Sequence, residues 1–316
     1  MAVKQVSNQT GVSARASSFE FQDGLRFETQ RWPYLLSLPF MWLLTFWVMA
    51  KKTLLKQKPH TNAYWFDGIS EVCRKIKEGA ASWRALDIIY NHNFGKDGKI
   101  TDFWLGMMNA QAVRNRKRLV TSLLIQNLRA MAKGQELRIL SLASGSAQSV
   151  IEALSVLKEE KIVVRAVLAD KDPTALENSK WLAHCYGVQN QITLLQKDIV
   201  RGLLKQERPF ENYGPFDVVE MVGFLEYAGD RLIVELMKSI HSLLAPGGIF
   251  LTSTIGNNPE RFFLHWVINW KMIYRSREAL QALVAAGFKQ NHCAILSEPL
   301  SIFHVAICRK IVESQG

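Results

Sequence analysis

The sequence predicts an α/β protein with a doubly wound, mostly parallel sheet of seven strands, preceded by an α-helical N-terminal extension. From residue 137 onward, short apolar runs typical of strands alternate with segments of helical periodicity. This alternation indicates a parallel sheet with helices on both faces. Before residue 137, only helical patterns and one long apolar run occur. The 316 residues, of which 48% are hydrophobic, are sufficient for a substantial core.

Charge divides the chain at the same place. Residues 1–136 contain 20 Lys and Arg against 10 Asp and Glu, whereas residues 137–316 contain 19 against 18. The basic front part indicates an anionic surface or ligand, or else a solvated basic face. We expect a loose N-terminus at 1–31, without a signal peptide because no apolar core follows the start. A helical extension or lid is expected at 32–136, and the sheet domain at 137–316.

The segment 32–50 is the most apolar part of the extension. It has 19 residues without a charge, and Arg31 precedes it. Its length makes it a transmembrane candidate, but Pro39 is expected to divide it and to leave the shorter piece 40–50. Three interpretations stay open: a buried or lid helix, a helix in contact with the membrane surface through 32–58, and a true membrane span.

Two further helical stretches are expected in the extension. Residues 62–92 show apolar residues at i, i+3 and i+4 spacing, and a second helix is expected from about Thr101, a suitable N-cap, to Met131. The second helix contains a basic cluster in which Arg114 and Arg116 point to different faces. We expect Arg114 to reach an anionic group of the substrate, with a solvated helix face as the alternative.

The C-terminal part has seven strand patterns and four helix patterns. The last two strands are close enough in sequence for a hairpin at one edge, which makes the sheet mixed. The expected strands are 137–142, 163–169, 192–196, 216–221, 249–253, 292–296 and 303–309, and the expected helices are 148–157, 173–185, 231–244 and 277–286.

The most informative stretch joins the first expected strand to the helix that follows it. Its small residues allow backbone N–H groups to approach a ligand closely. Gly145 is its only glycine, because Ala143 and Ala147 stand where such loops usually have glycine. Ser141 stands where an acid is common. Since alanine favours negative φ, we expect the turn to be shifted. Ser144 completes the expected contact set of this loop.

Ligands of such sheets bind outside the carboxyl ends of the strands, where the strand order reverses. Asp170 ends the second expected strand and can accept two hydrogen bonds from ribose hydroxyls. Asp198 follows the third strand and could accept a hydrogen bond from an adenine amine, and Gly223 after the fourth lets the backbone approach the ligand. The expected cofactor contacts also include the neighbouring residues Lys171, Ile199 and Val222.

This order of residues resembles the class I S-adenosylmethionine-dependent methyltransferases. The resemblance covers about residues 137–309 and implies a Rossmann-like fold with S-adenosyl-L-methionine as the cofactor. It implies that 141–147 holds the methionine part, Asp170 the ribose and Asp198 the adenine. Family loops usually read Asp-x-Gly-x-Gly-x-Gly, whereas this one reads Ser-x-Ala-x-Gly-x-Ala. The extension resembles that of a smaller group of such proteins with long N-terminal additions.

The resemblance predicts an enzyme that transfers a methyl group to a small or amphiphilic acceptor. Candidates near the reacting centre are Glu226, Tyr227 and Tyr90, and Asn257 is a candidate for contact with the substrate together with Arg114. The departures in the loop leave two alternatives. One is a non-methylating enzyme that closes the aminobutyryl chain of the cofactor and releases methylthioadenosine. The other is an inactive cofactor-binding or membrane-associated interaction protein.

The four cysteines, Cys73, Cys185, Cys293 and Cys308, form no CxxC pair. We therefore expect four reduced, mostly buried thiols in a cytoplasmic, at most membrane-associated, protein, and no metal site. No nucleic-acid partner is expected, because the sequence has no zinc finger or recognised RNA module. The expected partner is a small-molecule substrate.

Overall fold

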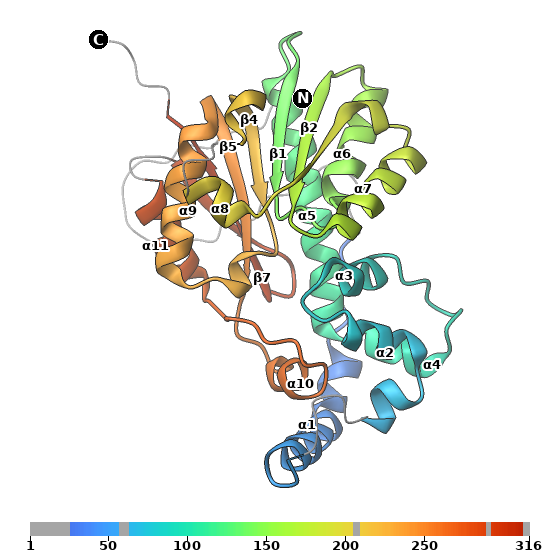
Figure 1. Ribbon diagram of the computed structural model, residues 1–316. Coiled ribbons are helices and arrows are strands. Elements are labelled where there is room, and N and C mark those ends of the chain that lie inside the picture. The colour runs from blue at the N-terminus through green and yellow to red at the C-terminus, as the bar shows by residue number, and fades with distance from the viewer. Residues whose placement is uncertain (1–25, 57–62, 205–208, 289–291, 312–316) are drawn as a thin grey trace.

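The computed structural model describes residues 26–56, 63–204, 209–288 and 292–311 (Figure 1). The N-terminus expected at 1–31 lies mostly outside these residues. One sheet has the strand order β3-β2-β1-β4-β5-β7-β6, with β7 antiparallel to both of its neighbours. The strands are β1 (Leu137–Leu142), β2 (Val164–Asp170), β3 (Ile192–Gln196), β4 (Phe216–Met221), β5 (Leu244–Ile255), β6 (His292–Ser297) and β7 (Phe303–Arg309). The predicted seven-stranded, mostly parallel sheet is confirmed.

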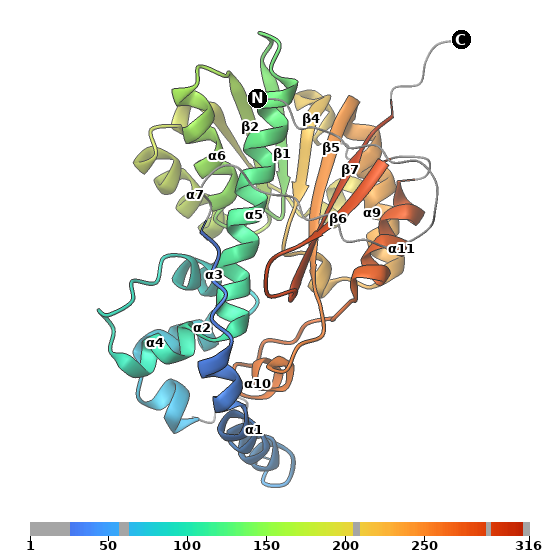
Figure 2. The same ribbon diagram turned by 180° about the vertical axis from the view of Figure 1, so that it is seen from behind.

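Helices cover both faces of the sheet (Figures 1 and 2). Side chains of α5, α6 and α7 share one apolar cluster with one face, and those of α9 and α11 share another cluster with the opposite face. The bounds in the sheet domain are α6 (Gln148–Glu159), α7 (Pro173–Cys185), α8 (Ile199–Leu204), α9 (Asp230–Leu243), α10 (Arg261–Trp266) and α11 (Arg277–Gly287), with 3₁₀ turns at Gln189–Gln191, Glu211–Tyr213 and Leu225–Tyr227.

The extension is helical, but its helices are divided differently from the prediction. It contains α1 (Trp32–Thr53), a π-helical turn (Tyr64–Gly68), α2 (Glu71–Glu78), α3 (Trp83–Tyr90), α4 (Lys99–Leu105) and α5 (Met108–Met131). The expected break at Pro39 is wrong, because α1 continues through that residue. The single helix expected from Thr101 is also wrong: Thr101 lies inside α4, whose N-cap is Gly98.

The break between α4 and α5 has a long-range cause. Gly106 closes α4 by donating its N–H to the carbonyl of Asp102 at 2.8 Å. The buried carboxylate of Glu260 then accepts the N–H groups of Met108 at 3.0 Å and Asn109 at 2.8 Å. These N–H groups belong to the first turn of α5, which has no partner for them within the helix. A residue just before α10 therefore fixes where α5 begins.

The extension packs against the sheet domain at the edge where the parallel strands have their carboxyl ends. One apolar cluster joins the buried face of α1 with α2, α3 and α4 and with the segment that follows β5. Both views show α1 beside α10 at the end of the molecule furthest from the sheet (Figures 1 and 2). The residues of α1 in this cluster are Met41, Leu44 and Val48. Only one stripe of α1 is therefore buried in the protein.

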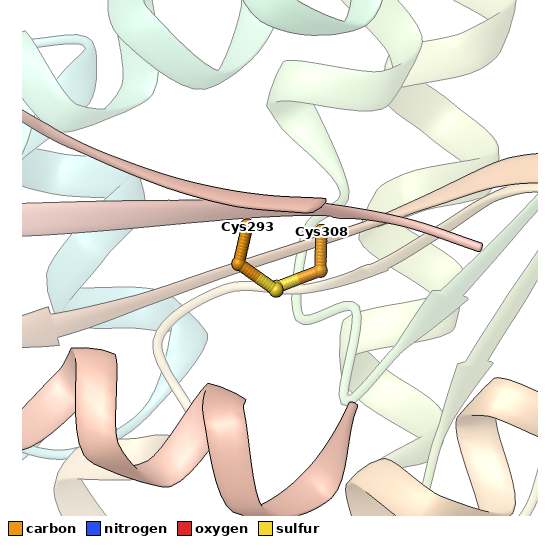
Figure 3. The surroundings of a disulfide bond; sticks show 2 residues. All are labelled: Cys293 and Cys308. Carbon is orange, nitrogen blue, oxygen red and sulfur yellow. A yellow bond between two sulfur atoms is a disulfide. The ribbon is translucent and has the colours of Figure 1, made fainter. Parts of the chain in front are cut away.

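The structure contains a disulfide between Cys293 and Cys308 (Figure 3). These residues are directly opposite each other on the antiparallel strands β6 and β7, with Cα atoms 4.1 Å apart. The expectation of four reduced thiols is therefore wrong for this pair. Cys73 is a free, buried thiol and Cys185 a free, exposed one.

Candidate active site

A cavity of about 390 Å³ lies at the carboxyl ends of β1, β2, β3 and β4, where the strand order reverses between β1 and β4. This is the place at which open α/β sheets bind their ligands. The β1–α6 loop forms one wall, and residues on and just before α3 form another. We call this space the polar cavity. The extension thus provides part of the wall of the site predicted from the sheet domain.

The β1–α6 loop bends through three residues with positive φ, at +49° for Ala143, +53° for Gly145 and +50° for Ala147. The expectation that alanine keeps this turn at negative φ is therefore wrong. The left-handed conformation costs a residue with a Cβ atom roughly 1–2 kcal/mol. Hydrogen bonds hold the turn: Ala147 N donates to the carbonyl of Ser144 at 2.8 Å, and Gly145 N donates to Asp170 Oδ2 at 2.8 Å.

Asp170 stands at the end of β2, as predicted, with its carboxylate at the polar cavity. Oδ2 accepts the N–H of Gly145 and Oδ1 accepts the N–H of Asp172 at 2.9 Å. A carboxylate oxygen can accept a second hydrogen bond, so both atoms keep capacity for a ligand hydroxyl. Across the described part of the chain, the buried Oγ of Ser144 has no hydrogen-bond partner, and Ser144 also lines the cavity. Both groups fit a polar ligand.

Asp198 lies at the same edge, after β3, and also acts as a helix cap. Its Oδ1 accepts the N–H groups of Val200 at 2.9 Å and Arg201 at 3.1 Å, at the start of α8. The proposed contact with an adenine amine stays a prediction. Four more of the predicted cofactor contacts line the polar cavity, namely Lys171, Ile199, Val222 and Gly223.

Ser141 does not line the cavity, because it is fully buried and its hydroxyl points to a neighbouring acid. Ser141 Oγ donates to Glu220 Oε2 at 2.5 Å, and the N–H of Val222 donates to Glu220 Oε1 at 3.0 Å. Glu220 is at the carboxyl end of β4 and lines the polar cavity. Burial raises the pKa of Glu220 to about 7, although the Ser141 hydroxyl and the nearby Arg116 oppose this shift.

A smaller, mostly apolar cavity of about 70 Å³ adjoins the polar one. Both cavities are lined by Leu86, Arg116, Gly223 and Tyr227, so these residues mark the junction between them. We call the second space the apolar cavity. Its other walls come from the cluster that unites the extension with the segment after β5, and they include the aromatic side chains of Phe66, Trp104, Phe263, Trp270 and Phe303.

Glu226 lines the apolar cavity at the junction and is only 2% exposed. Among the described residues, neither of its carboxylate oxygens has a hydrogen-bond partner, but Oε1 lies 3.5 Å from Nη1 of Arg116. Burial raises the pKa of Glu226, and the positive charge of Arg116 partly opposes that shift. A buried carboxylate with a raised pKa is a stronger base than an exposed one, so Glu226 is suited to take a proton from a group bound beside it.

The two tyrosines predicted near the reacting centre also lie here. The guanidinium of Arg116 donates from Nη2 to the hydroxyl oxygen of Tyr90 at 3.2 Å. Tyr227 accepts a hydrogen bond from Trp270 Nε1 at 2.6 Å, and burial raises the pKa of Tyr227 to about 12. Tyr227 therefore stays protonated at neutral pH, and its hydroxyl can donate one hydrogen bond in addition to accepting the one from Trp270.

The structure does not bring the two predicted substrate contacts to either cavity. Arg114 is buried, and its guanidinium donates to both carboxylate oxygens of Glu28, at 2.7 and 2.5 Å. Asn257 is exposed at the surface near α1, where its Oδ1 accepts a hydrogen bond from Arg261 at 2.8 Å. Arg114 is therefore occupied by an internal acid, and Asn257 is remote from the junction.

Two buried, charged residues that line the polar cavity, Arg116 and Glu220, were not among the predicted contacts. Arg116 belongs to the basic cluster, but it lies on a different face of the helix from Arg114, which was the predicted contact. Glu220 had a signal in the sequence, because it is an acid within an otherwise mostly apolar strand pattern, Phe216–Met221. Burying an acid at the end of a strand is costly, so its presence indicates that it binds a partner or a ligand there.

The strand order, and the position of the site at its reversal, define the Rossmann-like fold of the class I methyltransferases. The chain belongs to the family described as "Putative methyltransferase", which matches residues 47–310. The predicted fold class and the resemblance to class I methyltransferases are thus confirmed. No curated protein matches the chain.

Solved structures share this fold at low sequence identity. A possible exported protein from Bordetella parapertussis is 17% identical, with a TM-score of 0.62 over 88% of this chain and 97% of that one. The CurJ carbon methyltransferase is 15% identical, with a TM-score of 0.52 over 88% of this chain and 69% of that one. The CMeT domain of the citrinin polyketide synthase is 12% identical, with a TM-score of 0.51, over 79% and 68% of the two chains.

Proposed function

We propose that the protein is an S-adenosyl-L-methionine-dependent methyltransferase whose acceptor is a small apolar or amphiphilic molecule. The observation that supports this most is the junction of the two cavities. A polar cavity lined by loop backbone and by Asp170 meets an apolar cavity at Arg116 and Glu226. The polar space suits a polar cofactor, the apolar space of about 70 Å³ would take the apolar end of an acceptor, and the reacting atoms would meet between them.

The residues of the polar cavity fit the cofactor. Asp170 would accept hydrogen bonds from the ribose hydroxyls. The buried hydroxyl of Ser144, which has no hydrogen-bond partner among the described residues, would donate to a polar group of the cofactor. Asp198 would lie near the adenine. When bound, the cofactor supplies an electrophilic methyl group on a sulfonium. The protein's own contribution is then to position the acceptor and to exclude water.

Glu226 would take the proton of an acceptor hydroxyl or acid, because it is buried at the junction without a hydrogen-bond donor of its own. Arg116, 3.5 Å away, would stabilise the negative charge on the acceptor or on Glu226. A base is needed only when the nucleophile starts protonated. This favours oxygen nucleophiles on an apolar body, such as phenols or hydroxylated lipids.

The experiment is incubation of the full chain with S-adenosylmethionine, first alone and then with pooled phenolic and lipid acceptors, with mass spectrometry of the cofactor products. We expect only background S-adenosylhomocysteine without acceptor, and an increase when a suitable pool is added. Methylthioadenosine formed without any acceptor would instead support ring closure of the aminobutyryl chain. Calorimetric binding without turnover in any pool would support an inactive binding protein.

We further propose that α1 contacts an anionic membrane surface. Its outer face exposes large apolar side chains, including Leu36 at 79%, Leu43 at 69% and Phe46 at 63%. Its length and composition would also allow a membrane span. The opposite stripe, however, is buried in the protein, and Lys52 Nζ bonds Asn269 Oδ1 at 2.5 Å. Because one side of α1 is bound to the protein, we expect the helix to lie on a bilayer surface and not to cross it.

Charge favours the same partner for α1. The helix contains no acid, and its last turn also contains Lys51, whereas Lys52 bonds to the protein itself. Tryptophan and lysine side chains at the edge of an apolar face are typical of interfacial helices. Such a surface would also deliver an amphiphilic acceptor to the apolar cavity, because α1 packs on the cluster that forms the cavity wall.

Sedimentation with vesicles tests this contact. The wild type should pellet with vesicles of phosphatidylcholine and phosphatidylglycerol, and less with pure phosphatidylcholine. The double variant Leu43→Glu, Phe46→Glu should stay in the supernatant. Trp181→Glu on α7 is the matched control, because Trp181 is equally exposed at 62% but far from α1 in the fold. Equal pelleting of all three proteins, or none for the wild type, would overturn the proposal.

A further inference from the structure

The pair Ser141 and Glu220 explains how the site can lack the usual acid at the end of β1. The two residues are partners in the parallel register of β1 and β4. Related loops have an acid at the position of Ser141, where this chain has a short hydroxyl. The carboxylate of Glu220 reaches that hydroxyl at 2.5 Å. An acid is therefore present at the same end of the sheet, but it comes from the neighbouring strand.

The environment of Glu220 indicates a cationic ligand. Its side chain is only 7% exposed and yet lines the polar cavity. The two hydrogen bonds it accepts come from neutral donors, the hydroxyl of Ser141 and the backbone N–H of Val222. A buried carboxylate is costly unless a cation or several donors stabilise it. Arg116 lines the same cavity and its charge favours the ionised carboxylate, but among the described residues the two side chains form no hydrogen bond. A positively charged ligand group would add the charge-assisted hydrogen bond that Glu220 lacks.

We propose that Glu220 provides, from β4, the acid that related enzymes have at the end of β1, and that its carboxylate binds the α-ammonium group of the cofactor's methionine part. This inference rests on the proposed function, because it requires the polar cavity to hold the cofactor. Ser141 then acts as a positioning residue, because its hydroxyl donates a hydrogen bond to Oε2 of Glu220. Arg116 is the nearby cation, and its charge favours the ionised form of the carboxylate.

Two ligands separate this role from a structural one. S-adenosylhomocysteine contains the ammonium group without a sulfonium, whereas methylthioadenosine contains the same nucleoside without the amino-acid part. For Glu220→Gln, we expect calorimetry to show S-adenosylhomocysteine binding weakened by more than about tenfold, through the lost charge-assisted bond. Methylthioadenosine binding should change by less than about twofold, because that ligand makes no contact with the carboxylate.

An exchange variant provides the second test. In Ser141→Asp, Glu220→Ser the acid comes from β1 and its carboxylate extends into the space that the Glu220 carboxylate vacates, so S-adenosylhomocysteine affinity should recover to within about threefold of the wild type. Glu220→Ser alone should stay weak. This arm keeps the test valid if Glu220→Gln folds poorly, and thermal unfolding of each variant checks the fold.

The outcomes distinguish the inference from the proposed function. If the wild type binds neither ligand, the proposed function fails. If it binds both and Glu220→Gln weakens them equally, Glu220 only maintains the pocket and the inference is overturned. Unchanged S-adenosylhomocysteine affinity in Glu220→Gln also overturns it, since the ammonium group would then be bound elsewhere.

Discussion

Arg116 on α5 and Glu226 after β4 face each other at the junction of the two cavities, with Nη1 and Oε1 3.5 Å apart. Both are almost fully buried, at 4% and 2% exposure. Arg116 belongs to the extension and Glu226 to the sheet domain. The pair therefore connects the two parts of the chain at the place where the reaction would occur.

Removal of Arg116 should lower the free energy of unfolding, and the size of this loss should depend on pH. Arg116→Met leaves Glu226 buried without its cation, which destabilises by about 3 kcal/mol at pH 8. The folded-state pKa of Glu226 is already raised by burial and would rise further without Arg116. A raised pKa means that the folded state binds more protons than the unfolded state as pH falls. The difference in unfolding free energy between the wild type and Arg116→Met should therefore be smaller at pH 5.5 than at pH 8, as measured by urea unfolding. An equal difference at both pH values would contradict this account.

Asp170→Ala should weaken the binding of S-adenosylhomocysteine and methylthioadenosine alike, by more than about tenfold, because both ligands contain the ribose. The change also removes the acceptor for the N–H of Gly145 in the β1–α6 loop. Calorimetry with both ligands measures the effect. Asp217→Ala is the control, because Asp217 also accepts a backbone N–H, from Arg138 at 2.8 Å, but lies in the first half of β4. Unchanged affinity in Asp170→Ala would exclude the ribose assignment.

The strands of the sheet could be predicted closely because their signal is local. β1, β3, β4 and β7 have the predicted bounds, and so has α7, where Pro173 and its N-cap Asp172 mark the start. Buried strands read as continuous apolar runs, and alternating helices place them in one sheet. The order of acids at successive strand ends then located the polar cavity.

The remaining features depend on contacts between distant residues, which local patterns do not contain. Glu260 determines the start of α5 from more than a hundred residues away. Cys293 and Cys308 are brought together by the pairing of β6 and β7. The prediction that Arg114 contacts the substrate was wrong for the same reason, because the guanidinium of Arg114 is bound to the carboxylate of Glu28. A helical wheel separates the two arginines but does not say which face meets the site.

The cap provided by Glu260 makes a separate prediction about stability. Glu260→Ala leaves two N–H groups in the buried first turn of α5 without an acceptor, which should cost about 2–3 kcal/mol. Glu260→Gln keeps one acceptor oxygen and should cost less. Urea unfolding followed by circular dichroism measures both. The exposed Glu235→Ala is the control, because its ion pair with Lys238 should contribute less than about 1 kcal/mol. A loss for Glu260→Ala no larger than that of the control would contradict the cap.

Cofactor affinity should depend on pH through Glu220, whose pKa burial raises to about 7. Below that pH the empty site holds a protonated carboxyl group, which must release its proton before it can bind an ammonium group. S-adenosylhomocysteine affinity should therefore fall as pH decreases from 7.5 to 6, by at most about tenfold per pH unit. Arg116 on α5 also lines the polar cavity, its charge favours the ionised carboxylate, and it stays charged throughout this range. Glu220→Gln should remove the dependence, and methylthioadenosine should not show it in either protein. Calorimetry at several pH values measures all four curves. A slope that persists in Glu220→Gln would assign the titrating proton to another group.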